Sequence, residues 1–117
     1  MKILGVHHVA IGVKDVDEAV EFYGWLGLIV LPRPDFGIPG AWLQAGEQQV
    51  HLLSTDKAPP GFENHYAFQV DDLDAVVEML AAHGVQARRS SRVDGVGKQA
   101  FLRDPSGNVV ELNEPDR

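Results

Sequence analysis

Three histidines and one glutamate occupy corresponding places in the two halves of the chain. His8 and His65 are related by an offset of 57 (65 − 8), and His51 and Glu111 by an offset of 60 (111 − 51). Imidazole nitrogens together with a carboxylate are typical ligands of divalent transition metals. The alternative is that each of these side chains is hydrogen-bonded to a neighbour on a wetted sheet surface.

The chain contains an internal repeat. Residues 8–28 (HVAIGVKDVDEAVEFYGWLGL) align with residues 65–85 (HYAFQVDDLDAVVEMLAAHGV), and eight of these 21 positions are identical. Average amino-acid usage would give about one or two matches. The repeat continues through AWL (41–43) over AFL (100–102) and VHL (50–52) over VEL (110–112), with an offset that grows as small loop insertions accumulate.

Local signals predict the same elements in each copy. Asp15 and Asp72 are expected to cap helices that Gly27 and Gly84 end. Three short β-rich runs follow each helix, and DPSGN (104–108) and AGE (45–47) predict the last hairpin turns. The sequence therefore predicts an α+β fold with two βαβββ modules, about residues 3–55 and about residues 62–115, within a single domain over residues 1–117.

Alternation along the strands predicts where the candidate ligands point. Val9, Ile11 and Val13 share the face suited to packing under a helix, so His8 points to the other face. The same alternation places His51, His65 and Glu111 on the face away from the helices, beside the small residues Ala10, Gly12 and Ala67. A concave face with convergent polar groups is the default ligand site. His7 is expected to face the helix as a structural residue, and His83 to cap the second helix.

Composition restricts the class of protein. The 117 residues include no cysteine, which excludes thiolate metal sites and disulfides, and no apolar run is long enough to span a bilayer. A formal net charge of −7 opposes binding to nucleic acid or to an anionic membrane. We expect a cytoplasmic protein whose partner is a small molecule.

The sequence resembles the vicinal oxygen chelate superfamily, which includes glyoxalase I, methylmalonyl-CoA epimerase, fosfomycin-resistance thiol transferases, extradiol dioxygenases and bleomycin-binding proteins. The resemblance rests on HHVAIGVKDVDEAVEFY, on HYAFQVDDLDAVVEML and on DPSGNVVEL. It implies paired modules that form a curled, cup-shaped mixed sheet around a divalent metal, with His8, His51, His65 and Glu111 as ligands. Glyoxalase I-like enzymes usually carry Glu at the position of His51, so only Glu111 remains as a catalytic base. Without His51, the set His8, His65 and Glu111 also resembles the two-His-one-carboxylate arrangement of the dioxygenases and thiol transferases.

The expected function is metal-assisted proton transfer on a small oxo compound or thioester, of the lactoylglutathione lyase or isomerase type. Three imidazoles and one carboxylate suit Zn²⁺, Ni²⁺, Fe²⁺ or Mn²⁺. The alternatives are an Fe²⁺-dependent dioxygenase, a thiol transferase, or a non-catalytic protein that binds a small molecule such as an antibiotic. Trp42 is expected either to line the cup or to fill the core. The residues that could bind an anionic group, or else are solvated surface, are Arg33, Asp35, Arg88, Arg89, Arg92 and Lys98.

The linker STDKAPPGFEN (54–64) bears on assembly. Pro59 and Pro60 stiffen it toward an extended form, which favours modules that lie side by side over modules that fold face to face. We therefore expect a homodimer in which His8 and His51 of one chain share a site with His65 and Glu111 of the other. The alternative is a monomer whose own modules close one cup.

Overall fold

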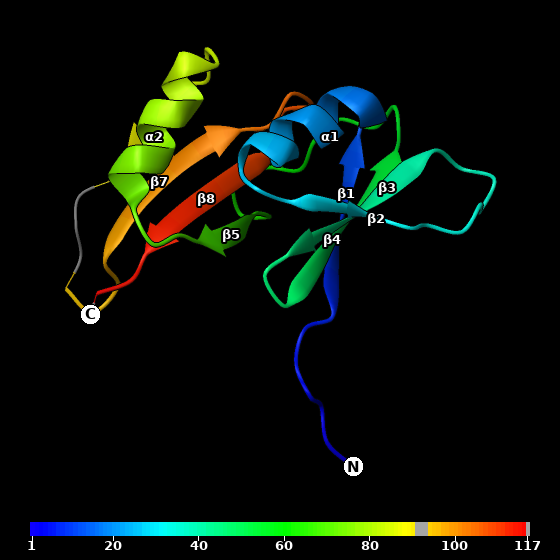
Figure 1. Cartoon of the computed structure of the whole chain (residues 1–117), viewed down its shortest axis with the longest axis horizontal. Coiled ribbons are helices and arrows are strands. Elements are labelled where there is room, and N and C mark those ends of the chain that lie inside the picture. Colours follow the sequence, from blue (N-terminus) through cyan, green and yellow to red (C-terminus); the bar gives the residue numbers. More distant parts are fainter. Residues whose placement is uncertain (91–93, 117) are drawn as a thin grey trace. The chain divides into compact units, whose positions relative to one another are not determined.

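The computed structural model describes residues 1–90 and 94–116. The chain forms two compact units, unit 1 (Met1–Pro59) and unit 2 (Pro60–Arg117). Unit 1 contains β1 (His8–Val13), α1 (Val16–Trp25), β2 (Ile29–Leu31), β3 (Gly40–Ala45) and β4 (Gln48–Ser54). Unit 2 contains β5 (Tyr66–Gln69), α2 (Leu73–Ala82), β6 (Arg88–Arg89), β7 (Lys98–Arg103) and β8 (Val109–Glu114). Figure 1 labels these elements along the chain.

The predicted α+β class and the repeated βαβββ order are confirmed. Each unit has one helix and one four-stranded mixed sheet, in the order β1-β4-β3-β2 in unit 1 and β5-β8-β7-β6 in unit 2. In both units the first strand pairs in parallel with the last, and the other pairs are antiparallel. The cup formed by the two modules together stays a prediction.

The register of the central strands is the same in both units. His51 lies opposite Ala10 and opposite Trp42, and Glu111 lies opposite Ala67 and opposite Phe101. The aligned pairs Ala10/Ala67 and His51/Glu111 therefore occupy equivalent places in three dimensions. The internal repeat in the sequence is a repeat of structure.

The core of each unit lies between its helix and one face of its sheet. In unit 1 the buried side chains of α1 include Phe22 and Tyr23, and the buried sheet residues include Leu43, Val50 and Leu52. In unit 2 α2 packs on β7 and β8 (Figure 1) and buries Leu73 and Leu80 against Ala100, Val110 and Leu112. We call the other face of each sheet its open face. Alternation puts His8, Trp42 and His51 on the open face of unit 1, and Phe101 and Glu111 on that of unit 2. His65 directly precedes β5 and lies beside Glu111.

The helix ends follow the predicted signals. Asp15 accepts a hydrogen bond from the backbone N–H of Glu18 at 3.0 Å, and Asp72 accepts one from Ala75 at 3.1 Å. Gly27 and Gly84 have φ values of 91° and 81°, which are conformations that favour glycine. His83 is the C-cap residue of α2, and its Nδ1 donates to the carbonyl of Met79 at 3.0 Å, as predicted.

The turn between β7 and β8 is built around a buried carboxylate. Asp104 accepts hydrogen bonds from the backbone N–H groups of Ser106 and Asn108 and from the side chain of Asn108, at 2.9–3.0 Å. Gly107 follows with a φ of 90°. These contacts fix the hairpin predicted from DPSGN and hold β8 in register with β7, which places Glu111.

No helix in residues 1–90 or 94–116 has the length and apolar character needed to cross a membrane.

Candidate metal-binding and catalytic site

Two histidines stack on the open face of unit 1. His8 at the start of β1 and His51 in β4 have ring centroids 3.8 Å apart and nearly parallel planes, with an angle of 13° between them. The strands that carry them are adjacent and parallel, so the separation follows from strand spacing. The small residue Ala10, opposite His51, leaves room for both rings.

His51 is enclosed on its other side by Trp42. The two rings are stacked at 4.5 Å with an angle of 11° between their planes. Nε2 of His51 lies 2.8 Å from Oε1 of Gln49, two residues away on the same face of the strand. Burial, followed by the nearby charges of His8, His7 and Arg33, lowers the pKa of His51. The neutral imidazole, which is the form that ligates metals, is therefore favoured. Trp42 lines the open face and does not fill the core.

The structure contradicts the prediction that His7 faces the helix. His7 is exposed, and its Nδ1 lies 2.9 Å from Nδ1 of His8, while its ring centroid is 6.4 Å from that of His51. The physical reason is that β1 begins at His8, so strand alternation does not extend to His7. His7 therefore belongs to the same imidazole cluster.

Unit 2 carries a histidine–carboxylate pair. Nε2 of His65 lies 3.0 Å from Oε1 of Glu111, and the side chains are 26% and 12% exposed. Oε2 of Glu111 accepts a hydrogen bond from Nε2 of Gln99 at 2.9 Å. Nδ1 of His65 donates to the carbonyl of Phe62 at 2.8 Å, because a carbonyl oxygen can only accept. Nε2 therefore remains available to bind a metal or to contact Glu111. Histidines that ligate metals commonly donate their other ring N–H to a carbonyl in this way.

Aromatic rings accompany His65 as Trp42 accompanies His51. The ring of Phe62 lies 5.2 Å from that of His65 and 5.1 Å from that of Phe101. Phe101 is the residue opposite Glu111 in the sheet, just as Trp42 is opposite His51. Each donor pair therefore has an apolar wall on one side.

The structure thus gathers the four predicted ligands as two pairs, His8 with His51 in unit 1 and His65 with Glu111 in unit 2. Within residues 1–90 and 94–116, no three His, Asp or Glu side chains form a metal-binding group on their own. A complete site of the predicted kind needs both pairs.

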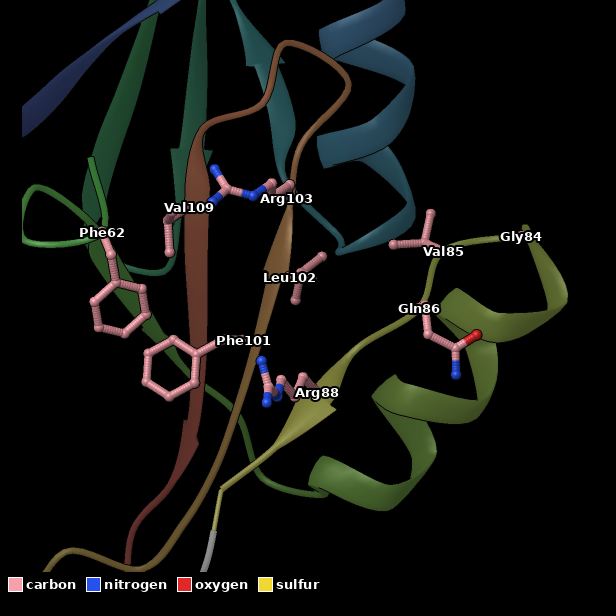
Figure 2. A pocket seen from close by; sticks show the side chains of 9 residues that line it. All are labelled: Phe62, Gly84, Val85, Gln86, Arg88, Phe101, Leu102, Arg103 and Val109. Atoms are coloured by element: carbon pink, nitrogen blue, oxygen red, sulfur yellow. The ribbon is translucent and has the colours of Figure 1, made fainter. Parts of the chain in front are cut away.

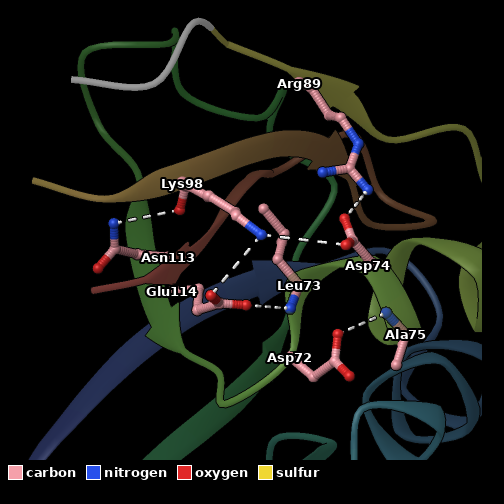
Figure 3. Close-up of polar contacts among 8 residues, drawn as sticks. All are labelled: Asp72, Leu73, Asp74, Ala75, Arg89, Lys98, Asn113 and Glu114. Carbon is pink, nitrogen blue, oxygen red and sulfur yellow. Dashed lines mark hydrogen bonds and ion pairs between the residues drawn. The ribbon is translucent and has the colours of Figure 1, made fainter. Parts of the chain in front are cut away.

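The candidate anion-binding residues fall into three groups. Nη2 of Arg33 donates to the carbonyl of Ile38 at 3.0 Å and its guanidinium lies over Phe36, while Asp35 accepts from the N–H of Gly37, so both serve their own loop. Arg89 and Lys98 contact acidic residues, as Figure 3 shows: Asp74 lies 2.6 Å from Arg89, and Lys98 lies 4.0 Å from Asp74 and 3.9 Å from Glu114. Arg88 has no such partner among the described residues, and Arg92 lies outside them.

The sequence did not identify Gln49, Gln99 and Phe62 as neighbours of the site. Gln49 could have been found, because it shares the strand face of His51 two residues away. Gln99 reaches Glu111 from the adjacent strand, and Phe62 belongs to the linker, so neither contact follows from spacing along the chain. Strand pairing and loop conformation decide them.

Comparisons of the sequence and of the structure with known proteins identify relatives of the same superfamily. The model of the Glyoxalase/Bleomycin resistance protein/Dioxygenase superfamily matches residues 5–112. The chain is 29% identical to Glyoxylase I 4 from Arabidopsis thaliana, over 96% of this chain and 71% of that protein. It is 28% identical to Metallothiol transferase FosB from Shouchella clausii, over 93% of this chain and 79% of that protein. The crystal structure of a glyoxalase family protein from Bacillus anthracis superposes with a TM-score of 0.88 at 26% identity, over 99% of this chain and 98% of that chain.

Proposed function

Because the chain belongs to the Glyoxalase/Bleomycin resistance protein/Dioxygenase superfamily, we propose that it is a divalent-metal-dependent lyase or isomerase that moves a proton on a small oxo compound or thioester. The observation that carries the proposal is the equal register of two donor pairs on open sheet faces. His51 stands opposite Ala10 with His8 beside it, and Glu111 stands opposite Ala67 with His65 beside it.

The residues fit a transition metal. The proposed ligands are His8, His51, His65 and Glu111, and this mixture of nitrogen and oxygen donors suits Zn²⁺, Ni²⁺, Fe²⁺ or Mn²⁺. The lowered pKa of His51 and the bond from Nδ1 of His65 to Phe62 both support the ligating form of these rings. When bound, the metal supplies Lewis acidity toward the oxygens of the substrate.

Glu111 is the proposed base. Its carboxylate is mostly shielded from solvent and is oriented at both oxygens, by His65 on one side and by Gln99 on the other. Such a carboxylate can accept a proton from carbon and return it to a neighbouring atom without rotating away. Trp42 and Phe101 exclude water beside the donor pairs and offer an apolar surface to the substrate body.

Metal content tests the proposal directly. We expect about one divalent transition metal per chain after reconstitution, measured by elemental analysis. The double variant H8A/H65A should lose the bound metal, whereas H83A, which removes an imidazole that caps α2, should retain it. Metal that stays substoichiometric and does not respond to H8A/H65A would show that these imidazoles are not the ligands.

Activity tests the reaction. We expect turnover of methylglyoxal in the presence of a thiol, lost with EDTA and restored by one of the four metals. A thiol transferase is the second candidate, because the chain is 28% identical to a protein named as a metallothiol transferase. The products distinguish the two, since a lyase or isomerase converts the thiol adduct into an isomer and a transferase leaves the thiol covalently joined to an electrophile.

A further inference from the structure

A pocket of about 530 Å³ lies within unit 2. The residues that line it include Phe62, Gln86, Arg88, Phe101, Arg103 and Val109 (Figure 2). Its volume lies in the range of small-molecule sites. Two guanidinium groups and two phenyl rings in one pocket favour a ligand with an anionic group and an apolar body.

The strand register places this pocket next to the proposed base. Arg88 of β6 is opposite Phe101 of β7, and Phe101 is opposite Glu111 of β8. These three side chains therefore form one row across neighbouring strands on the open face, with about 4.8 Å between strands. Two strand spacings, about 10 Å, therefore separate the backbone at Arg88 from the backbone at Glu111.

Arg88 differs from the neighbouring cations Arg89 and Lys98 because no carboxylate in the described part of the chain neutralises its charge. Arg89, the next residue, points to the helix side and binds Asp74 at 2.6 Å, and Lys98 lies near Asp74 and Glu114 (Figure 3). No carboxylate in the described part of the chain forms an ion pair with Arg88. In Figure 2 its guanidinium extends toward Phe101.

The internal repeat shows that the fold does not require these cations. The residue opposite Trp42 in unit 1 is Leu31, which corresponds to Arg88 opposite Phe101. Gln44, two residues after Trp42, corresponds to Arg103, two residues after Phe101. Gln44 donates to the carbonyl of Gly46 in its own turn, as Arg103 does to that of Gly107, so these two side chains share a structural role. At the position of Arg88, unit 1 builds the same sheet with Leu31 and without a cation, so packing does not explain Arg88.

Arg103 has a fixed position at the far end of the pocket. Its Nη1 donates to the carbonyl of Gly107 at 2.8 Å, which holds the guanidinium beside the turn. Figure 2 shows it extending toward Val109. Arg103 is thus a second, held cation that raises the positive potential of the pocket, while Arg88 keeps its donors for a ligand.

We propose that Arg88 is a specificity-determining residue that binds a carboxylate or phosphonate group of the substrate, whose apolar body lies against Phe62 and Phe101. A planar guanidinium binds such anions through two parallel hydrogen bonds. The assignment rests on the function proposed above, since it names the substrate class of that site. The reacting atoms of the substrate then lie toward Glu111, and its anionic end lies toward Arg88.

Ligand titrations followed by NMR test the proposal on the full chain with EDTA present, so that the result does not depend on the metal. The probes are benzoate, phenylphosphonate and the neutral isostere benzamide. We expect at least one anion to bind with a dissociation constant of about 10 mM or below, as an efficiency of about 0.3 kcal/mol per heavy atom gives. The shifted signals should include the Nε–H of Arg88 and the ring of Phe101. Tighter binding of benzoate would assign a carboxylate, and tighter binding of phenylphosphonate a phosphonate.

The matched control is the adjacent arginine. R88Q and R89Q remove the same charge one residue apart, but Arg89 points to the helix side. We expect R88Q to weaken binding of the anion about tenfold, as the loss of a charged hydrogen bond does, and R89Q to leave it unchanged. Equal weakening in both variants, binding of benzamide as tight as that of benzoate, or no binding of either anion would overturn the proposal. Anion binding that survives while H8A/H65A leaves the metal content unchanged would separate this pocket from the proposed metal chemistry.

Discussion

At the scale of single residues, the hydrogen bond from His65 to the Phe62 carbonyl decides what the Glu111 pair can do. With Nδ1 donating to that carbonyl, the proton between Nε2 and Oε1 of Glu111 belongs either to an imidazolium or to a carboxylic acid. A metal held at Nε2 would take the place of this proton and leave Glu111 ionised, which is the form that can ligate or accept a proton. Metal binding and activation of the base are therefore coupled in the proposed site.

The variant E111Q tests the base. An amide keeps the shape of the side chain and can still ligate weakly, but it cannot accept a proton, so we expect a folded protein with part of its metal and about 10²–10⁴-fold lower turnover. Steady-state kinetics, elemental analysis and circular dichroism on the same preparation check the three parts. A fully active E111Q would move the base to another residue.

The pairing of the four candidate side chains could be expected from the sequence, because alternation and the internal repeat specify their positions independently. Their role as metal ligands stays a prediction. It failed at His7, where the strand boundary decides orientation, and it left Trp42 undecided until the register opposite His51 was known. Among the candidate cations, Arg88 and Arg89 are equivalent in the sequence. The register of β6 with β7, together with the position of Asp74 on α2, separates the paired arginine from the one that lines the pocket.

At the scale of secondary-structure elements, the two helices end in the same way because glycine supplies the conformation that the turn requires. Gly27 has a φ of 91°, which a side chain adopts only with strain. Gly24 lies three residues earlier, inside α1. A Cβ added to Gly24 would meet no other atom within 4 Å. The backbone conformation therefore requires glycine at position 27, after the end of α1, but not at position 24 inside the helix.

We expect the replacement of each by alanine to change stability in opposite directions. G24A should raise the free energy of unfolding by about 0.5–1 kcal/mol, because alanine is the better helix former. G27A should lower it by about 1–2 kcal/mol, because alanine is strained at that φ. Urea denaturation of the two variants against the parent measures both. If G27A were as stable as the parent, the helix would not end through a left-handed residue.

The helices and turns were predictable because their signals are local. Asp15 and Asp72 act within three residues, and Asp104 acts within four residues of its own turn. The length of β6, which has only two residues, was not predictable. An edge strand ends where its neighbour ceases to pair, and no local signal in VQARRSS marks that point.

At the scale of the whole molecule, the metal site that we propose would have to be assembled from the two donor pairs. Each four-stranded sheet is open and has two edge strands, β1 and β2 in unit 1 and β5 and β6 in unit 2. Open edges and open faces are normally covered in soluble proteins. With the two prolines of the linker, these features lead us to expect a homodimer in which each site takes one pair from each chain.

Mixing two inactive variants tests the shared site. Chains carrying H8A and chains carrying E111A, refolded together, should form heterodimers in which one of the two sites is intact. Each heterodimer should then have about half of the parental activity, and a randomly paired equimolar mixture about a quarter. Sedimentation at micromolar concentration should give the mass of a dimer. A monomer, or verified heterodimers without activity, would exclude sharing between chains.

The parallel pairing of the first strand with the last has a consequence for folding. β1 in unit 1 and β5 in unit 2 find their partners only after the helix and two further strands have been made, so each sheet closes through contacts that are distant along the chain. Non-local parallel pairing is slow, because chain entropy is lost before the contact forms. β4, the last strand of unit 1, ends at Ser54. During synthesis on the ribosome, unit 1 thus has all the strands of its sheet, and the time to pair them, while unit 2 is still being translated.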